Sequence, residues 1–230
     1  MKTKCTLSVL LFLLSFSITA QVYNVKDAVE FFHSNELSRG EWKPVLTADD
    51  VSGSPYLNEE FANGTVYTTS KVQYNGLPLR YNAYNDQVEF KNNEDEIQAI
   101  AVPESIEKIE FNNIEMVYSP YTNAKKIKRG YFIVMEEGEA SLYQKPHIIF
   151  EQAKEAAPYK DPEPPKFVKK TDYYYIKVGN SEAKNIASKK DLVAVFPDHQ
   201  KQVEKFVKKN KVKPNKPERM VKLVKFYNQL

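Results

Sequence analysis

The sequence contains a single cysteine, Cys5, and this residue stands in the first twenty, MKTKCTLSVLLFLLSFSITA. Two early lysines, an apolar stretch over 7–16 and the small Ala20 form the pattern of a secretory signal peptide over 1–20, with an uncleaved anchor as the alternative. Removal of this segment leaves a chain without cysteine, which excludes a disulfide framework and a thiolate metal site. We therefore expect an exported protein, periplasmic or associated with the outer membrane.

Glycine and histidine are also scarce. The seven glycines stand singly, so no phosphate-binding loop is present. His33, His147 and His199 lack the close partners that a zinc site needs, and no GxSxG motif occurs. The pairs of acidic residues match neither a calcium loop nor the two carboxylates of a glycosidase. The pattern predicts no catalytic residue, no metal and no cofactor, although an enzyme built from dispersed residues leaves no local signature.

Beyond residue 20 the chain has no apolar run long enough to cross a bilayer, so no further transmembrane segment is expected. The 33 basic and 30 acidic residues almost balance over the whole chain. Residues 21–150 nevertheless carry a net charge of −8, and residues 151–230 one of +9. This split indicates either docking of the two halves on one another or an acidic partner for the basic end.

Short alternating segments rich in Tyr, Val, Ile and Phe dominate the centre of the chain, separated by Asn, Gly, Pro and charged turns. This spacing is typical of an antiparallel β structure rather than of βαβ units. We predict an α+β fold, with a β-rich sandwich, roll or open barrel followed by a small basic helical C-terminal region. The expected strands are Thr65–Thr69, Lys71–Tyr74, Leu77–Tyr84, Gln87–Lys91, Glu96–Val102, Ile106–Phe111, Ile114–Tyr118, Tyr131–Glu136 and Ala140–Gln144.

The segment GLPLRYNAYNDQVEFK (76–91) predicts a hairpin. A two-residue turn at Asn85-Asp86 would place Tyr81 opposite Phe90 and give the hairpin one apolar face. The polar residues of the segment, including Glu89, would then occupy the other face. The segment therefore predicts a half-buried sheet and no reaction.

The expected organisation has five parts. A signal peptide (1–20) precedes a helix and irregular lead-in (21–52), and the antiparallel β region follows (53–155). The four prolines of AAPYKDPEPPK make residues 156–166 a stiff connector. Residues 167–230 combine a hairpin turning at Gly179-Asn180 with basic amphipathic helices. The apolar stripes of these helices are predicted to hold Val203, Phe206 and Val207, and then Met220, Leu223, Val224 and Tyr227.

Two features offer surfaces for a partner, the lysines of the last helices and the tyrosines of the strands. Tyrosine gives rigid amphipathic contact area, and lysine attracts acidic groups. The basic helices could face an anionic surface, but they lack an aromatic face for stacking bases, so no nucleic acid is expected. The candidate contact residues are Lys205, Lys208, Lys209, Tyr84, Tyr173, Tyr174 and Tyr175.

The stretches GSPYLNEEFANGTVY, YNGLPLRYNAYNDQVEF and ERMVKLVKFYNQL together resemble uncharacterised exported proteins of the Gram-negative bacterial envelope. This resemblance implies an envelope setting and assigns no activity. Our first hypothesis is a non-enzymatic, secreted cell-envelope protein that works by protein binding, as an adaptor or accessory subunit of a periplasmic or outer-membrane complex. A β protein that binds a small ligand, lipid or glycan is the alternative, and an enzyme with dispersed active-site residues is the second.

Overall fold

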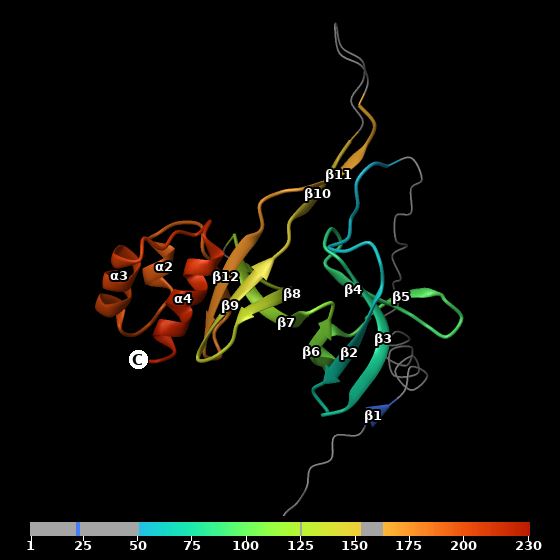
Figure 1. Ribbon diagram of the computed structural model, residues 1–230, viewed down its shortest axis with the longest axis horizontal. Helices are drawn as coiled ribbons and strands as arrows, with labels where there is room; N and C mark the ends of the chain where they lie inside the picture. The colour runs from blue at the N-terminus through green and yellow to red at the C-terminus, as the bar shows by residue number, and fades with distance from the viewer. Residues whose placement is uncertain (1–21, 24–50, 125, 153–162) are drawn as a thin grey trace, which may run out of the picture.

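The computed structural model describes residues 22–23, 51–124, 126–152 and 163–230. The predicted signal peptide, a helix expected over 24–37, and most of the proline connector lie outside these residues. Strands dominate the described chain and its helices gather at the C-terminal end (Figure 1), which confirms the β-rich α+β prediction. Among the described residues, every helix is too short or too polar to cross a membrane.

The strands occur largely where alternation predicted them. The main changes are that two predicted strands merge into β3 (Gln73–Asn82) and that β7 (Ile114–Asn123) and β8 (Lys126–Glu136) run further toward their shared turn. The pair of β10 (Ile148–Glu151) and β11 (Lys166–Lys169) was not predicted. The strands are β1 Val22–Tyr23, β2 Ala62–Thr68, β3 Gln73–Asn82, β4 Gln87–Lys91, β5 Ile97–Ala99, β6 Ile106–Phe111, β7 Ile114–Asn123, β8 Lys126–Glu136, β9 Ala140–Lys145, β10 Ile148–Glu151, β11 Lys166–Lys169, β12 Tyr173–Val178 and β13 Ala183–Asn185.

Five strands form a closed barrel in the order β7-β8-β9-β12-β13. Neighbouring strands pair antiparallel, except that β13 returns to β7 in parallel, with Ala183 opposite Tyr121. This last pairing closes the ring, and it settles the question of barrel closure that the sequence left open. Strands from both sides of the proline connector contribute to it, because β12 pairs with β9 along its whole length.

An open sheet continues from β7 in the order β6-β2-β3-β4-β5, with β1 parallel to β3, whereas β10 and β11 pair only with each other. Strands β6 and β7 meet at Asn112-Asn113, and both residues have positive φ, 51° and 59°. This is the backbone conformation of a type I′ turn, which asparagine tolerates well. Strand β7 therefore belongs to the sheet at its start and to the barrel at its end.

The predicted register of the β3–β4 hairpin is wrong by two residues. Tyr81 pairs with Val88, and Leu79 pairs with Phe90, so the turn spans four residues, 83–86. Asp86 takes a positive φ of 57° in this wider turn. A change of two residues keeps every side chain on its predicted face, because side chains alternate with a period of two.

Three apolar cores hold the sheet, the barrel and the helices together. The first lies between the open sheet and the outer face of β7 and β8, around Leu79, Phe90 and Met116. The second fills the barrel interior with aromatic rings. The third lies between the other side of the barrel and the helices. The molecule is therefore built as sheet, barrel and helices in sequence across Figure 1.

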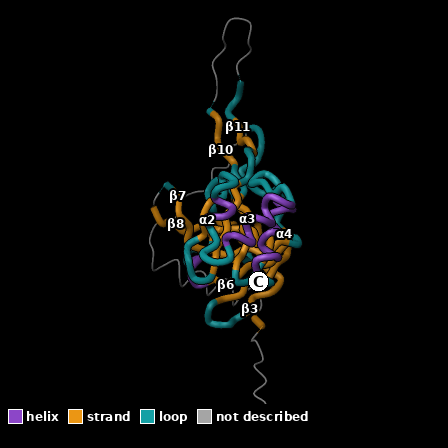
Figure 2. Tube along the Cα trace, turned by 90° about the vertical axis from the view of Figure 1, so that its left-hand side faces the viewer, coloured by secondary structure: helices purple, strands orange, loops and turns teal. Residues whose placement is uncertain are grey.

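The helices cover β9 and β12. Helix α3 buries Val203 and Val207, and α4 buries Leu223 and Val224, as the predicted helical stripes require. The paired strands β10 and β11 leave the body of the molecule beside the connector (Figure 2). The helices are α2 Asp191–Ala194, α3 Gln200–Lys209 and α4 Pro217–Tyr227.

Candidate functional site

The contact residues predicted from the sequence lie in separate parts of the molecule. Lys205, Lys208 and Lys209 are exposed on α3, at the helical end. The tyrosines lie on the barrel and at the β3–β4 turn, so they form no common surface with the lysines. We therefore consider the two groups separately.

The four tyrosines have different environments. Tyr84 is 38% exposed and meets Phe167 edge to face at 5.1 Å, and Tyr173 is 45% exposed and lies 4.7 Å from the His147 ring. Tyr174 is half-buried against the helical core. Tyr175 is 5% exposed inside the barrel, so its ring is not available to a partner. The strand alternation across Tyr173-Tyr174-Tyr175 explains why adjacent rings differ so much.

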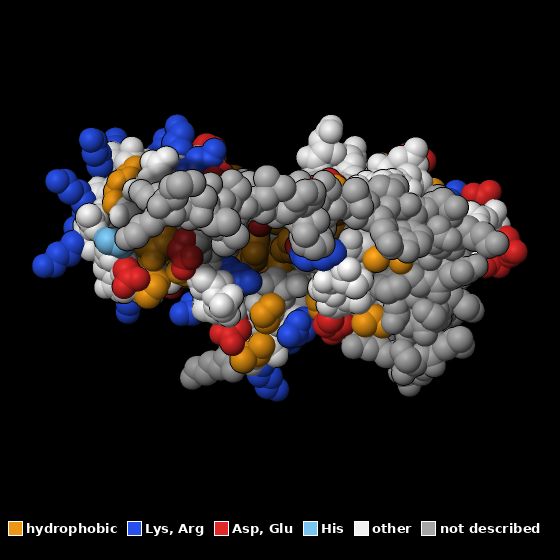
Figure 3. Space-filling model, turned by 90° about the horizontal axis from the view of Figure 1, so that it is seen from below, with side chains coloured by type: hydrophobic (Ala, Val, Ile, Leu, Met, Phe, Trp, Pro, Cys, Tyr) orange, Lys and Arg blue, Asp and Glu red, His pale blue; other side chains and the backbone are white. Residues whose placement is uncertain are grey.

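The lysines of the helical end form a broad basic surface. Residues 199–230 hold ten Lys or Arg against two Glu. In Figure 3 basic side chains surround this end of the molecule. Lys208 pairs with Glu204 at 2.8 Å, Lys225 pairs with Glu136 at 3.4 Å, and Arg219 donates to backbone carbonyls. The seven remaining lysines are exposed and have no carboxylate partner among the described residues.

Three of these lysines form a stripe along α3. Lys201, Lys205 and Lys209 follow one another at intervals of four residues, which places them on the same side of the helix. Like charges at this spacing destabilise a helix by about 0.2–0.5 kcal/mol per pair. Their charge is not compensated by the acidic half of the chain in the described structure, so it is available to a partner.

The least exposed ion pair that joins the sheet to the barrel involves Asp86 and Lys145. The Lys145 Nζ donates to Asp86 Oδ2 at 2.7 Å and to the Tyr131 carbonyl at 3.0 Å. The other oxygen of Asp86 accepts from the Tyr81 hydroxyl at 2.7 Å and from the Tyr131 N–H at 3.2 Å. The two charged side chains are 15% and 27% exposed. They bind the β3–β4 turn to β8 and β9.

Gly130 makes room for this cluster. A Cβ at this position would lie 2.4 Å from Asp86 Oδ2 and 2.8 Å from Lys145 Nζ. Burial lowers the pKa of Lys145 more than the attraction of Asp86 raises it. A lysine with a lowered pKa can act as a base or nucleophile, but this one is held by a carboxylate and a carbonyl. The arrangement supports the junction between sheet and barrel, and we assign it no reaction.

A second buried charge lies on the outer face of the hairpin, where the sequence predicted solvent. Glu89 is fully buried and binds Arg80 at 2.8 Å, and it also accepts from Asn82 at 3.2 Å. The Arg80 guanidinium lies 3.5 Å from the centroid of Tyr56 and 4.3 Å from that of Phe61. The segment 56–61, which precedes β2 and carries these two rings, therefore covers this face of the sheet. Glu89 therefore lies on its predicted polar face, but this face is covered rather than open to solvent.

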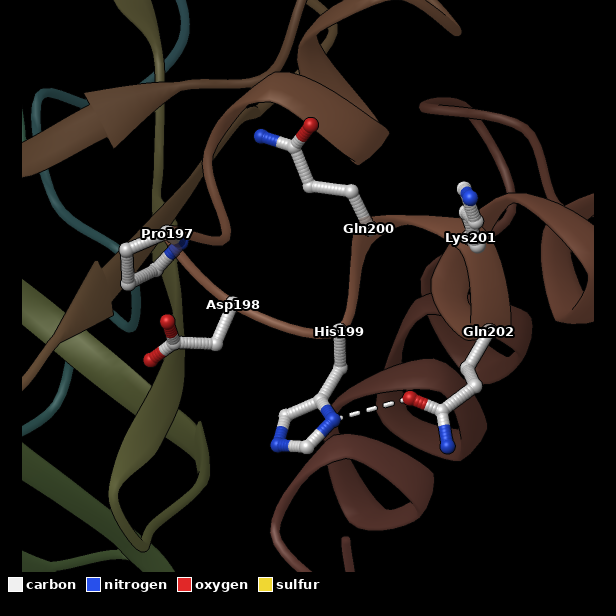
Figure 4. A pocket seen from close by; sticks show the side chains of 6 residues that line it. All are labelled: Pro197, Asp198, His199, Gln200, Lys201 and Gln202. Carbon is white, nitrogen blue, oxygen red and sulfur yellow. Dashed lines mark hydrogen bonds between the residues drawn. The ribbon is translucent and has the colours of Figure 1, made fainter.

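An open depression of about 670 Å³ lies where the chain enters α3. In Figure 4 the His199 ring turns toward Gln202, and Nδ1 lies 2.8 Å from Oε1 of Gln202. The lining residues are exposed, and the Asp198 carboxylate points away from this pair (Figure 4). Within the described part of the chain, no group of three His, Cys, Asp or Glu side chains is placed to hold a metal ion.

Sequence reasoning missed a further basic surface at the tip of the β7–β8 hairpin. Residues 126–129 read KIKR, and all four side chains are exposed. The signal was present in the sequence as a charged run beside the predicted strand Tyr131–Glu136. Because that strand was expected to begin later, the run was not placed on a projecting hairpin.

Comparison of the chain with family models, curated proteins and solved structures gives no match.

Proposed function

We propose that this protein is a non-enzymatic component of the bacterial cell envelope, exported to the periplasm or the outer membrane, that binds an acidic protein through the stripe of Lys201, Lys205 and Lys209 on α3. The observation that carries the proposal is the set of exposed lysines that have no carboxylate partner within the described part of the chain. The protein would serve as an adaptor or accessory subunit, with the sheet and barrel as a scaffold.

The packing of α3 supports this assignment. Val203 and Val207 fix the inner side of the helix against the core, so the lysines lie on a supported surface rather than on a free helix. A complementary acidic surface would relieve the repulsion within the stripe and accelerate association. The barrel gives no support to the alternative of ligand binding, because aromatic rings fill its described interior. These rings belong to Tyr121, Phe132, Tyr143 and Tyr175.

The test is crosslinking of the tagged protein in cells, comparing wild type with K201E/K205E/K209E. We expect a specific crosslinked complex with wild type, its loss in the variant, and a Tm close to wild type because the three side chains are exposed. The matched control is K169E/K189E/K190E, which makes the same charge change at three exposed lysines outside α3 and should retain the complex.

The complex should also weaken as salt is raised, because exposed charges are screened beyond about 10 Å at 0.1 M ionic strength. An unchanged complex in the α3 variant would overturn the proposal. Equal loss in the two variants would assign the effect to overall charge and would overturn the role of the stripe.

A further inference from the structure

The tip of the β7–β8 hairpin combines an exposed isoleucine with cations on both faces. Ile127 is 66% exposed, more than any other large apolar side chain in the described residues. Its neighbours Lys126, Lys128 and Arg129 are exposed and form no ion pair with a described residue. The hairpin projects from the body of the molecule (Figure 2).

Strand geometry distributes these charges around the hairpin. Successive side chains alternate, so Lys126 and Lys128 lie on one face, and Ile127 and Arg129 lie on the other. Lys184 adds another exposed cation to the face of Ile127, because Thr122 pairs with Ile127 on one side and with Lys184 on the other. Side chains two residues apart on a strand are separated by about 7 Å. This is less than the screening length at physiological salt, about 8 Å, so the charges act together.

The tip has little apolar area for a folded partner. A stable protein interface covers roughly 800 Å² on each side, whereas this tip offers one apolar side chain between cations. A lipid surface needs no complementary shape. Its headgroups can surround cations on every side of the hairpin, and its acyl boundary accepts an isolated apolar side chain.

We propose that the β7–β8 hairpin docks on an anionic phospholipid bilayer, with Ile127 inserted at the acyl boundary and Lys126, Lys128 and Arg129 among the phosphates. This surface is separate from the α3 stripe. The hairpin would hold the protein at a membrane face while α3 remains available, and the inference does not depend on a protein partner for α3.

The test is cosedimentation with vesicles of the chain from residue 21 to residue 230, the form expected after export, because the apolar segment 7–16 would itself bind lipid. We compare vesicles of pure phosphatidylcholine with vesicles of an equimolar mixture of phosphatidylcholine and phosphatidylglycerol. Wild type should bind the mixed vesicles and not the neutral ones. Each cation near an anionic surface strengthens binding about fivefold, so K126Q/K128Q/R129Q should weaken it roughly hundredfold.

Two further variants test whether binding depends on insertion of Ile127 and on the position of the cations, rather than on overall charge alone. I127S keeps every charge and should weaken binding about tenfold through the loss of apolar contact. K201Q/K205Q/K209Q removes the same charge from α3 and should change binding little. All three variants alter exposed side chains, and their Tm values show whether the fold is kept.

Three results would overturn the inference. These are no binding of wild type to the mixed vesicles, full binding by I127S, and equal losses in the hairpin and α3 variants. Binding of an acidic protein that requires the hairpin, without vesicle binding, would assign the surface to a protein and would also overturn it.

Discussion

The ion pair of Asp86 and Lys145, at the junction between sheet and barrel, should contribute measurably to the stability of the protein. D86N replaces the carboxylate by an amide, which keeps an oxygen for the Tyr81 hydroxyl and the Tyr131 N–H but removes the negative charge facing Lys145. Asparagine also tolerates the positive φ of this position. K145M keeps an unbranched side chain, one atom shorter than that of lysine, and removes its charge. The double variant D86N/K145M removes both charges, so no unpaired charge is left.

The size of the effect follows from burial. A hydrogen bond to a charged group contributes about 1.5–3 kcal/mol, and removal of one partner of a fully buried ion pair costs about 3–5 kcal/mol. The side chains of Lys145 and Asp86 are 15% and 27% exposed, so the pair is not fully buried and the cost of removing one partner lies at or below the lower end of about 3–5 kcal/mol. We expect each single variant to lower the free energy of unfolding by about 2–3 kcal/mol. The double variant should cost at least about 1 kcal/mol less than the sum of the two, because neither charge is left unpaired.

The assay is urea unfolding of the four proteins, followed by circular dichroism. The control is the same cycle at Lys108 and Glu115, an ion pair on the sheet with side chains 34% and 25% exposed, where the coupling should be about 0.2–1 kcal/mol. Additive effects at Asp86 and Lys145, within about 0.3 kcal/mol, would refute the coupling that we infer from the geometry.

Two further predictions concern the helical end and the response to alkali. N228A should lower the free energy of unfolding by about 1–3 kcal/mol, because Asn228 binds both the N–H of Ala140 at 2.7 Å and its carbonyl at 2.9 Å. The control is Q229A, at the exposed neighbouring position. Equal Tm values for the two variants would contradict the prediction. Burial raises the pKa of Tyr81 and Tyr131 well above 10.0. Above pH 10 the unfolded chain therefore loses protons that the folded chain keeps. The free energy of unfolding should then fall as pH rises toward the folded-state pKa values. Urea unfolding at neutral pH and above pH 10, with tyrosinate absorbance as a second signal, measures this fall, and constant stability would contradict the assignment.

The local parts of the fold could be predicted from the sequence. β4 and β6 have the predicted bounds, because alternation and the turn residues beside them are both local signals. The buried apolar faces of α3 and α4 could also be predicted, since helical spacing selects Val203, Val207, Leu223 and Val224 as buried.

Long-range contacts account for what the sequence did not show. Glu89 has the pattern of a polar-face residue until the segment 56–61 is placed over its partner Arg80. Tyr175 reads as a contact residue until β12 joins the barrel and turns its ring inward. The pairing of Asp86 with Lys145 joins residues from distant hairpins, and no local pattern relates them. The predicted contact role of Lys205, Lys208, Lys209, Tyr84, Tyr173 and Tyr174 stays a prediction.

The parallel pairing of β13 with β7 has a consequence for how the protein folds. Residues 121 and 183 must meet before the barrel has a continuous wall, so the ring cannot form on a ribosome or during export until the segment 183–185 has emerged. Until then β7 and β12 each present an unpaired edge, and such edges recruit strands from other chains. Chains that end before residue 183 should therefore aggregate, while the sheet from β2 to β6 needs none of the later residues for its strand pairing.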